Sequence, residues 1–262
     1  MNTNTTTNTN TVMNTNTNIH EVVALIDRSG SMSGKENDTI DGINSTIEVL
    51  KTEQTSNTIT KVSIKLFDHE EKLLVRSIDL NNIRPITCSD YIVRGQTALL
   101  DAMGNTLTYF MQKKIMEPTA YNICTIYIVT DGLENASKHY KSHHIKNMIK
   151  EAQEKYNIQI LYLGANQDAI LEANKYGISQ GNAMNYSENS ENVEQAYRSA
   201  AYAARRHASG DNISFTNAER TLSQAEPEVS EIFRTPPLQV ARTRSRGDFN
   251  SPPRIRRQRS SR

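Results

Sequence analysis

A short polar loop after an apolar run carries the residues in this chain that are best suited to chemistry. The apolar run of residues 22–26 is followed by Asp27, Ser29 and Ser31. The run's length and β-branched content predict a strand buried on both faces, and ligands bind at the carboxyl ends of strands in open α/β sheets. One carboxylate and two neutral hydroxyls suit a hard cation, so the loop favours Mg²⁺, Mn²⁺ or Ca²⁺ over zinc, which prefers His and Cys.

The Asp-x-Ser-x-Ser spacing resembles the metal-ion-dependent adhesion site of von Willebrand factor type A domains. That family adds a threonine on a loop and an aspartate at the end of a later strand. Thr97 opens an amphipathic stretch and resembles the first, and Asp131 follows the apolar run 126–130 and resembles the second. The resemblance implies a metal site formed by Asp27, Ser29, Ser31, Thr97 and Asp131.

The resemblance also implies a fold and a function. The fold is α/β, with a doubly wound, Rossmann-like, mostly parallel sheet, one antiparallel edge strand and helices on both faces. In the family the hydroxyls usually bind the ion directly, and one or both carboxylates act through water. We therefore expect Mg²⁺ (or Mn²⁺ or Ca²⁺) to capture an Asp or Glu of a protein partner, without catalysis.

Each motif taken alone has a simpler interpretation. A serine-rich turn after a strand is common turn and cap chemistry, and an Asp-Gly dipeptide is an ordinary turn. Thr97 alone is expected at or near a helix N-cap. Asp101, one turn later, either bonds to a metal ligand or lies in solvent, and Glu134 and Asn135 are expected in a surface loop rather than at the rim of the site.

Hydrophobic periodicity predicts alternating strands and helices. Strands are expected over residues 21–27, 58–68, 72–80, 121–130, 158–163 and 183–186. Helices are expected over residues 35–51, 98–114, 138–156, 168–176 and 191–207. The second and third strands should form a hairpin at the sheet edge, and the irregular segment 81–96 should cover the rim of the site.

The histidines and cysteines offer little further chemistry. His139 and His143 form an i, i+4 pair in the helix expected over 138–156, a spacing that can bind a transition metal, but no acidic residue supports them. Cys88 and Cys124 have neither disulfide-framework nor metal-site spacing, and Cys124 is expected to be a buried free thiol. Two such cysteines fit a reducing compartment.

Composition divides the 262 residues into three parts. Residues 1–18 are nearly all Asn and Thr and are expected to be disordered, residues 19–209 form the type A domain, and residues 210–262 form a disordered tail rich in Ser, Pro and Arg. Hydrophobic residues make up only 36% of the chain, partly because of these ends. We expect a cytoplasmic protein without membrane insertion, because the sequence shows neither a secretory signal nor a transmembrane run.

Two other functions compete with metal-dependent binding. A Mg²⁺-dependent phosphohydrolase also places an Asp after its first strand. Such enzymes commonly have a carboxylate two residues later, where this chain has Ser29. Arg28 is the nearby charge that could hold a phosphate. The Arg-rich tail could instead bind nucleic acid weakly, as an accessory role. The net charge of the chain is only +1, although arginines crowd the end of that tail at Arg242, Arg244, Arg246, Arg254, Arg256, Arg257, Arg259 and Arg262.

Overall fold

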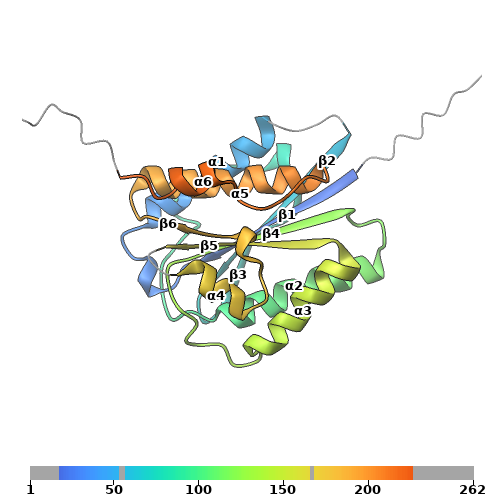
Figure 1. The fold of residues 1–262 in the computed structure, drawn as a ribbon, viewed down its shortest axis with the longest axis horizontal. Coiled ribbons are helices and arrows are strands. Elements are labelled where there is room, and N and C mark those ends of the chain that lie inside the picture. The colour runs from blue at the N-terminus through green and yellow to red at the C-terminus, as the bar shows by residue number, and fades with distance from the viewer. Residues whose placement is uncertain (1–17, 53–56, 166–167, 227–262) are drawn as a thin grey trace, which may run out of the picture. The chain divides into compact units, whose positions relative to one another are not determined.

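A six-stranded sheet forms the centre of the computed structural model, which describes residues 18–52, 57–165 and 168–226 (Figure 1). The strand order is β3-β2-β1-β4-β5-β6. All neighbouring pairs are parallel except β2 and β3, which form an antiparallel hairpin at one edge. The strands are β1 (Asn18–Asp27), β2 (Thr58–Phe67), β3 (Glu71–Asp79), β4 (Ile123–Thr130), β5 (Ile158–Ala165) and β6 (Ala183–Tyr186).

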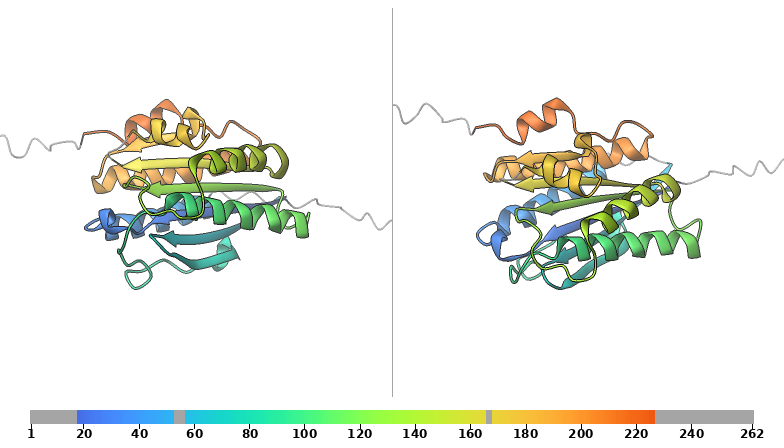
Figure 2. Two further views of the ribbon diagram at one scale, coloured as in Figure 1. Left: turned by 90° about the horizontal axis from the view of Figure 1, so that it is seen from below. Right: turned by 60° about the horizontal axis from the view of Figure 1, so that its bottom comes forward.

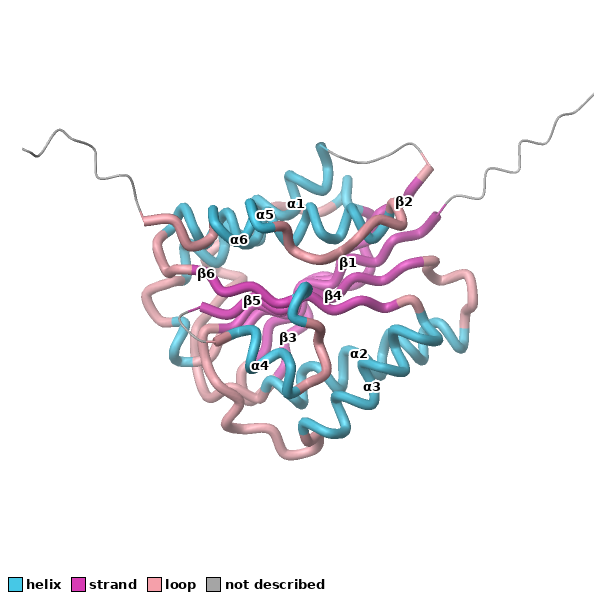
Figure 3. The backbone as a smooth tube through the Cα atoms, viewed as in Figure 1, coloured by secondary structure: helices cyan, strands magenta, loops and turns pink. Residues whose placement is uncertain are grey.

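Helices cover both faces of the sheet (Figures 1 and 3). One face carries α1 (Glu36–Thr52), α5 (Ser190–Ala208) and α6 (Asn217–Leu222). The other carries α2 (Leu99–Met116), α3 (Ser142–Tyr156) and α4 (Ala169–Lys175), and Figure 2 shows α2 and α3 running alongside the strands. Short 3-10 turns span Gly30–Met32, Leu80–Asn82 and Gln180–Asn182. This arrangement confirms the predicted α/β fold with its single antiparallel edge strand.

Strand β1 is buried on both faces, as its apolar run predicts. Val22 and Ala24 belong to the core beneath α1 and α5, whereas Val23 and Leu25 belong to the core beneath α2 and α3. Successive side chains of a strand point to opposite faces, so a continuous apolar run is what a strand between two helical layers requires. β1 lies between β2 and β4, and its carboxyl end opens onto the edge that holds the candidate site.

Helix α3 begins at Ser142, whereas periodicity predicts a start at residue 138. The Asp101 carboxylate accepts hydrogen bonds from the backbone N–H groups of residues 138–140, at 2.8 to 2.9 Å, and holds this segment outside the helix. His139 therefore precedes the helix that contains His143. The predicted i, i+4 histidine pair on one helix is wrong.

The folded part of the chain continues beyond residue 209, where the sequence pattern fades. Thr216 and Glu219 form a capping box that begins α6. The Glu219 carboxylate also accepts two hydrogen bonds from Arg206 of α5, at 2.9 and 3.0 Å, so α6 is joined to the last long helix. The Asn/Thr-rich segment 1–17 and the Arg-rich residues 227–262 lie outside the described residues.

Two further expectations concern the thiols and the membrane. Cys124 is a fully buried free thiol on β4, as predicted, and Cys88 is exposed. Within the described ranges, no helix combines the length and apolar character needed to cross a bilayer.

Helices α1 and α5 approach each other closely at Gly42. A Cβ at this position would lie 2.4 Å from Cδ2 of Tyr197, whose ring is buried on α5. Cβ contacts this short do not occur without movement, and the ring is held on all sides by the core. A glycine inside α1 is therefore required by packing, although glycine is a weak helix former.

We predict that Gly42→Ala destabilises the protein. The added methyl group overpacks a buried contact, at a cost of about 1–3 kcal/mol, which outweighs the helix-propensity gain of about 1 kcal/mol. Thermal or urea unfolding of the full chain measures the difference. Asp41→Ala, on the exposed face of the same helix, is the control. A Gly42→Ala variant more stable than wild type would contradict the packing argument.

A buried polar chain lies on the α5 face, between β1, β4 and α5. The Thr125 hydroxyl bonds with Nε2 of His20 at 2.9 Å and with Nδ1 of His207 at 2.8 Å. Burial lowers the pKa of His20 to about 3, with a contribution from the nearby His207. Burial also lowers the pKa of His207 to about 4. Both rings are therefore neutral in the folded protein near neutral pH.

We predict that stability falls as the pH drops below 6.5. The unfolded chain takes up protons on these histidines near pH 6.5, whereas the folded chain does so only near pH 3 to 4, so the unfolded state binds more protons in this window. Urea unfolding of wild type and His207→Gln between pH 7 and about 4.5 measures the slope. The slope should be shallower in His207→Gln than in wild type, because one of the two suppressed protonations is removed. Equal slopes in the two proteins would contradict the prediction.

Candidate metal centre

The end of β1 places the Asp27 carboxylate, fully buried, at the base of the candidate site. Its Oδ1 accepts a hydrogen bond from the Ser29 backbone N–H at 2.7 Å, and its Oδ2 accepts one from the Thr130 hydroxyl at 2.6 Å. Thr130 ends β4, which runs parallel to β1 in register. The role of Thr130 was not predicted, although its position at the end of the strand, directly before Asp131, was an available signal.

The four other residues of the predicted site gather around Asp27. The Ser29 and Ser31 hydroxyl oxygens lie 3.1 Å apart, and the Thr97 hydroxyl donates to Ser29 Oγ at 2.9 Å. The Ser31 hydroxyl donates to Asp131 Oδ1 at 2.5 Å. The Ser29, Ser31, Thr97 and Asp131 side chains are thus linked by short contacts, and Asp27 joins them through the Ser29 backbone N–H, although the residues come from three separate stretches of sequence. Ser31 is exposed and forms the mouth of the group, whereas Ser29 and Thr97 are buried below it.

Backbone contacts hold the Thr97 loop against the serine loop. The N–H of Gly30 donates to the carbonyl of Gly95 at 3.0 Å. Gly95 has φ +73°, and the imidazole of His69 lies where its side chain would begin, so both backbone conformation and space favour glycine here. Asn135 accepts a hydrogen bond from the Thr97 N–H at 2.9 Å and donates its own N–H to the Thr97 carbonyl at 3.0 Å.

Two acidic residues near the site bind backbone N–H groups of the surrounding segments. Glu134 accepts from the N–H of Leu100 in the first turn of α2 at 2.9 Å, which makes it a helix cap. Thr97 itself is not the N-cap, since Ala98 holds that position. Asp101 accepts the three N–H groups of residues 138–140, so it neither bonds to a predicted ligand nor lies free in solvent.

Arg28 points away from the site. Its guanidinium pairs with the buried carboxylate of Asp68, at 2.9 Å from Nε to Oδ2, and Arg94 approaches the same oxygen at 2.9 Å. Only 6% of Arg28 is exposed. The backbone before Arg28 is held as well, because the Tyr91 hydroxyl donates to the Asp27 carbonyl at 2.6 Å. Arg28 therefore fixes the loop and does not present a charge to a phosphate at the site.

Lys35 brings a positive charge to the site that sequence analysis did not identify. Its ammonium bonds to Asp131 and also to Glu188, on the loop before α5. Burial lowers the pKa of Lys35, but the hydrogen bonds to the two carboxylates outweigh this effect and raise it overall. Lys35 is therefore charged and neutralises part of the carboxylate charge. Its place shortly after the serine loop was a weak signal, whereas nothing in the sequence pattern pointed to Glu188.

The Asp27 carboxylate lacks a cationic partner of its own among the described residues. Burial, with a smaller contribution from the negative charge of Asp131, raises its pKa to about 6, although the hydrogen bonds from Thr130 and Ser29 oppose the shift. A cation placed among these oxygens would favour the ionised form.

Gly132 leaves room for such a cation. A Cβ at this position would lie 3.0 Å from Ser31 Oγ and 3.1 Å from Thr97 Oγ1, in the space that the hydroxyls share. The surrounding donors are all oxygens, from two carboxylates and three hydroxyls. This donor set fits a small hard cation such as Mg²⁺ and lacks the nitrogen and sulfur ligands that zinc prefers.

Comparison with solved structures identifies proteins of similar fold. No family model matches the chain, and no curated protein has a matching sequence. Among solved structures, the von Willebrand factor domain of the type V pili tip protein Mfa5 from Porphyromonas gingivalis is 12% identical, with 72% of this chain and 96% of that chain covered and a TM-score of 0.53. The von Willebrand factor type A protein from Catenulispora acidiphila is 14% identical, with 71% and 43% covered and a TM-score of 0.50.

A third structure is that of proximal thread matrix protein 1 from the mussel byssus, with zinc in its metal-ion-dependent adhesion site motif. It is 15% identical, with 72% of this chain and 46% of that chain covered and a TM-score of 0.50. This chain thus spans less than half the length of the mussel and Catenulispora proteins. At these identities the likeness concerns the fold alone. Residues 18–226, with the gaps given above, have the fold of a von Willebrand factor type A domain.

Proposed function

We propose that residues 18–226 form a divalent-cation-dependent protein-binding module. Its ion is held by Asp27, Ser29, Ser31, Thr97 and Asp131. The observation that carries the proposal is the convergence of these five oxygen-bearing side chains around the space left by Gly132. The mussel protein of the same fold holds zinc at its own adhesion-site motif, which is consistent with a cation at this edge of the sheet.

Mg²⁺ is the ion that this donor set suits best, with Mn²⁺ or Ca²⁺ as substitutes. Mg²⁺ binds oxygen ligands and keeps several waters, so few protein groups suffice. Three neutral hydroxyls leave most of the ion's charge uncompensated, and the carboxylates contribute directly or through water. An ion of this kind attracts a further anionic ligand from outside the protein.

A partner carboxylate would approach past Ser31, the exposed member of the group. An Asp or Glu of another protein supplies the oxygen that completes the coordination. The competing function, a Mg²⁺-dependent phosphohydrolase, needs an acid or nucleophile near the ion. The position two residues after Asp27 holds Ser29, whose hydroxyl bonds with Ser31 and Thr97, and Arg28 is turned toward Asp68. This geometry favours binding over catalysis.

The metal assignment predicts a single Mg²⁺ or Mn²⁺ site in the full chain. Asp131→Asn should weaken binding by more than about tenfold, because it removes one of the two negative charges at the ion. Isothermal titration with each metal measures the affinity, and circular dichroism checks folding. Asp211→Asn, at an exposed aspartate on the loop between α5 and α6, is the control. Identical titrations for wild type and Asp131→Asn would reject the assignment.

Lys35 is predicted to compete with the metal for Asp131. Replacing Lys35 with Met removes the ammonium but keeps an apolar stem, so the repulsion between Lys35 and an incoming cation disappears. Lys35→Met should bind Mg²⁺ several-fold more tightly than wild type by titration. Lys51→Met, at the exposed end of α1, is the control. Weaker binding in Lys35→Met would show that Lys35 positions Asp131 instead.

A binding function and an enzymatic one give different outcomes in a capture experiment. Proteins retained by the full chain in Mg²⁺ should be lost with chelator and lost from Ser31→Ala, which removes the hydroxyl at the mouth of the site. An enzyme predicts turnover of a phosphate or phosphodiester substrate, abolished by Asp27→Asn. Metal-dependent turnover above the background of metal alone would replace the binding proposal with the enzymatic one.

A further inference from the structure

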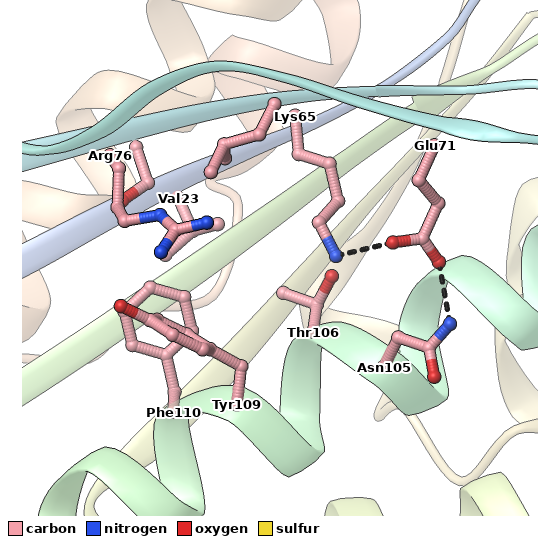
Figure 4. Close-up of a pocket in the computed structure, with 10 residues that line it drawn as sticks. Val23, Lys65, Glu71, Arg76, Asn105, Thr106, Tyr109 and Phe110 are labelled. Atoms are coloured by element: carbon pink, nitrogen blue, oxygen red, sulfur yellow. Dashed lines mark hydrogen bonds and ion pairs between the residues drawn. The ribbon is translucent and has the colours of Figure 1, made fainter.

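A cavity lies between the β2–β3 hairpin and α2, away from the candidate metal centre, with a volume of about 330 Å³ (Figure 4). None of the candidate metal ligands lines it. Its volume is within the range of small-molecule binding sites, about 300–1,000 Å³. The lining residues are Val23, Ser63, Lys65, Glu71, Leu73, Arg76, Asn105, Thr106, Tyr109 and Phe110.

An irregularity in β3 shapes this cavity. The pairing of β2 with β3 shifts register on both sides of Ile64, and Ser77 has φ +48°, which is rare for a residue with a side chain. The Ser77 N–H donates to the Ser63 hydroxyl at 2.8 Å instead of continuing a regular ladder. In a regular strand, residues three apart face opposite sides of the sheet. The shift brings Leu73 and Arg76 to the same cavity.

The base of the cavity is apolar and the rim is open. Val23, Thr106 and Phe110 are at most 2% exposed. Leu73 of β3 and Tyr109 of α2 are each 39% exposed, so both present apolar surface to solvent. The Tyr109 and Phe110 rings meet edge to face, 5.0 Å between centroids, which gives this wall a rigid aromatic surface.

The charges at the rim leave one cation without an acidic partner. Lys65 Nζ lies 2.7 Å from Glu71 Oε2, and Asn105 donates to Oε1 of the same carboxylate at 2.8 Å, so Lys65 and Glu71 neutralise each other. The Arg76 guanidinium lies 5.7 Å from the centre of the Tyr109 ring. Among the described residues, no carboxylate pairs with it. The cavity therefore carries one positive charge above aromatic surface.

We propose that this cavity binds a small aromatic monocarboxylate. The ligand carboxylate pairs with the Arg76 guanidinium, whose planar N–H groups match the two oxygens. The aromatic body fills the space between Leu73 and Tyr109, above Val23. The volume limits the ligand to about one fused ring pair, and the single unpaired cation favours one negative charge over the several charges of a nucleotide.

The test uses 2-naphthoate as the probe, with the full chain and excess chelator, so that no metal can bind the probe's carboxylate. The neutral 2-naphthamide has the same aromatic body and is the matched ligand control. Ligand-observed NMR titration measures both affinities, and the backbone amide shifts of residues 105–110 locate the site. We expect saturable naphthoate binding that is clearly tighter than naphthamide binding.

Variants at Arg76 test the ion pair. Arg76→Gln should weaken naphthoate binding by about tenfold or more, since a charge-assisted contact is lost, and should leave naphthamide binding unchanged. Arg76→Lys should restore part of the naphthoate affinity. Arg198→Gln, on α5 at the opposite face of the sheet, is the protein control. Because Arg76 is exposed, these variants should keep the wild-type circular dichroism spectrum.

Several outcomes would overturn the proposal. These are equal affinities for naphthoate and naphthamide, naphthoate binding that survives Arg76→Gln, amide shifts confined to other residues, and absence of saturable binding at millimolar probe. Since the chelator excludes metal, none of these outcomes bears on the proposed metal centre. A failed Mg²⁺ titration would equally leave this cavity unaffected.

Discussion

Two carboxylates at adjacent strand ends, Asp27 and Asp131, impose the constraint on which the site depends. Both side chains are buried, and buried charges require partners or a cation to compensate them. The surrounding structure supplies hydroxyl and N–H donors to Asp27 and an ammonium to Asp131. The serine loop is in turn held by the Gly95 carbonyl and the Thr97 hydroxyl, and Asn135 holds the Thr97 loop. The architecture of this edge of the sheet follows from the need to keep these two charges in place.

Much of this arrangement could be predicted from sequence because it follows from local rules. A continuous apolar run requires a strand between two layers, and parallel strands end at the same edge, so residues that follow β1 and β4 must lie close together. The grouping of Asp27 with Asp131 follows directly. Thr97 needed the family resemblance as well, since no strand end positions it. That these residues bind a metal stays a prediction, whereas the fold is confirmed.

Features that depend on distant partners were not predicted. The start of α3 is set by Asp101, which takes the N–H groups that would otherwise continue the helix. Glu188 reaches Lys35 from a loop that is more than 150 positions away in the chain. The cavity at β3 arises from a register shift, which alternation of apolar and polar residues does not reveal. In the first two cases a side chain distant in the sequence decides the local structure, and periodicity carries no information about such pairings.

The pairing of Lys35 with both Asp131 and Glu188 has a consequence for how an ion would enter. Lys35 belongs to the same chain as Asp131, so its effective concentration at that carboxylate is fixed by the fold. Neither dilution nor protein concentration changes it. An ion that bound at the proposed site would therefore exchange with Lys35, and its affinity would reflect the difference between its own interaction with Asp131 and that of Lys35. The displaced ammonium would keep Glu188 as its partner and so would remain compensated. Ion entry would thus leave Lys35 bound to Glu188 alone, and the ion concentration needed to half-fill the site would depend on this pairing as well as on the oxygen ligands.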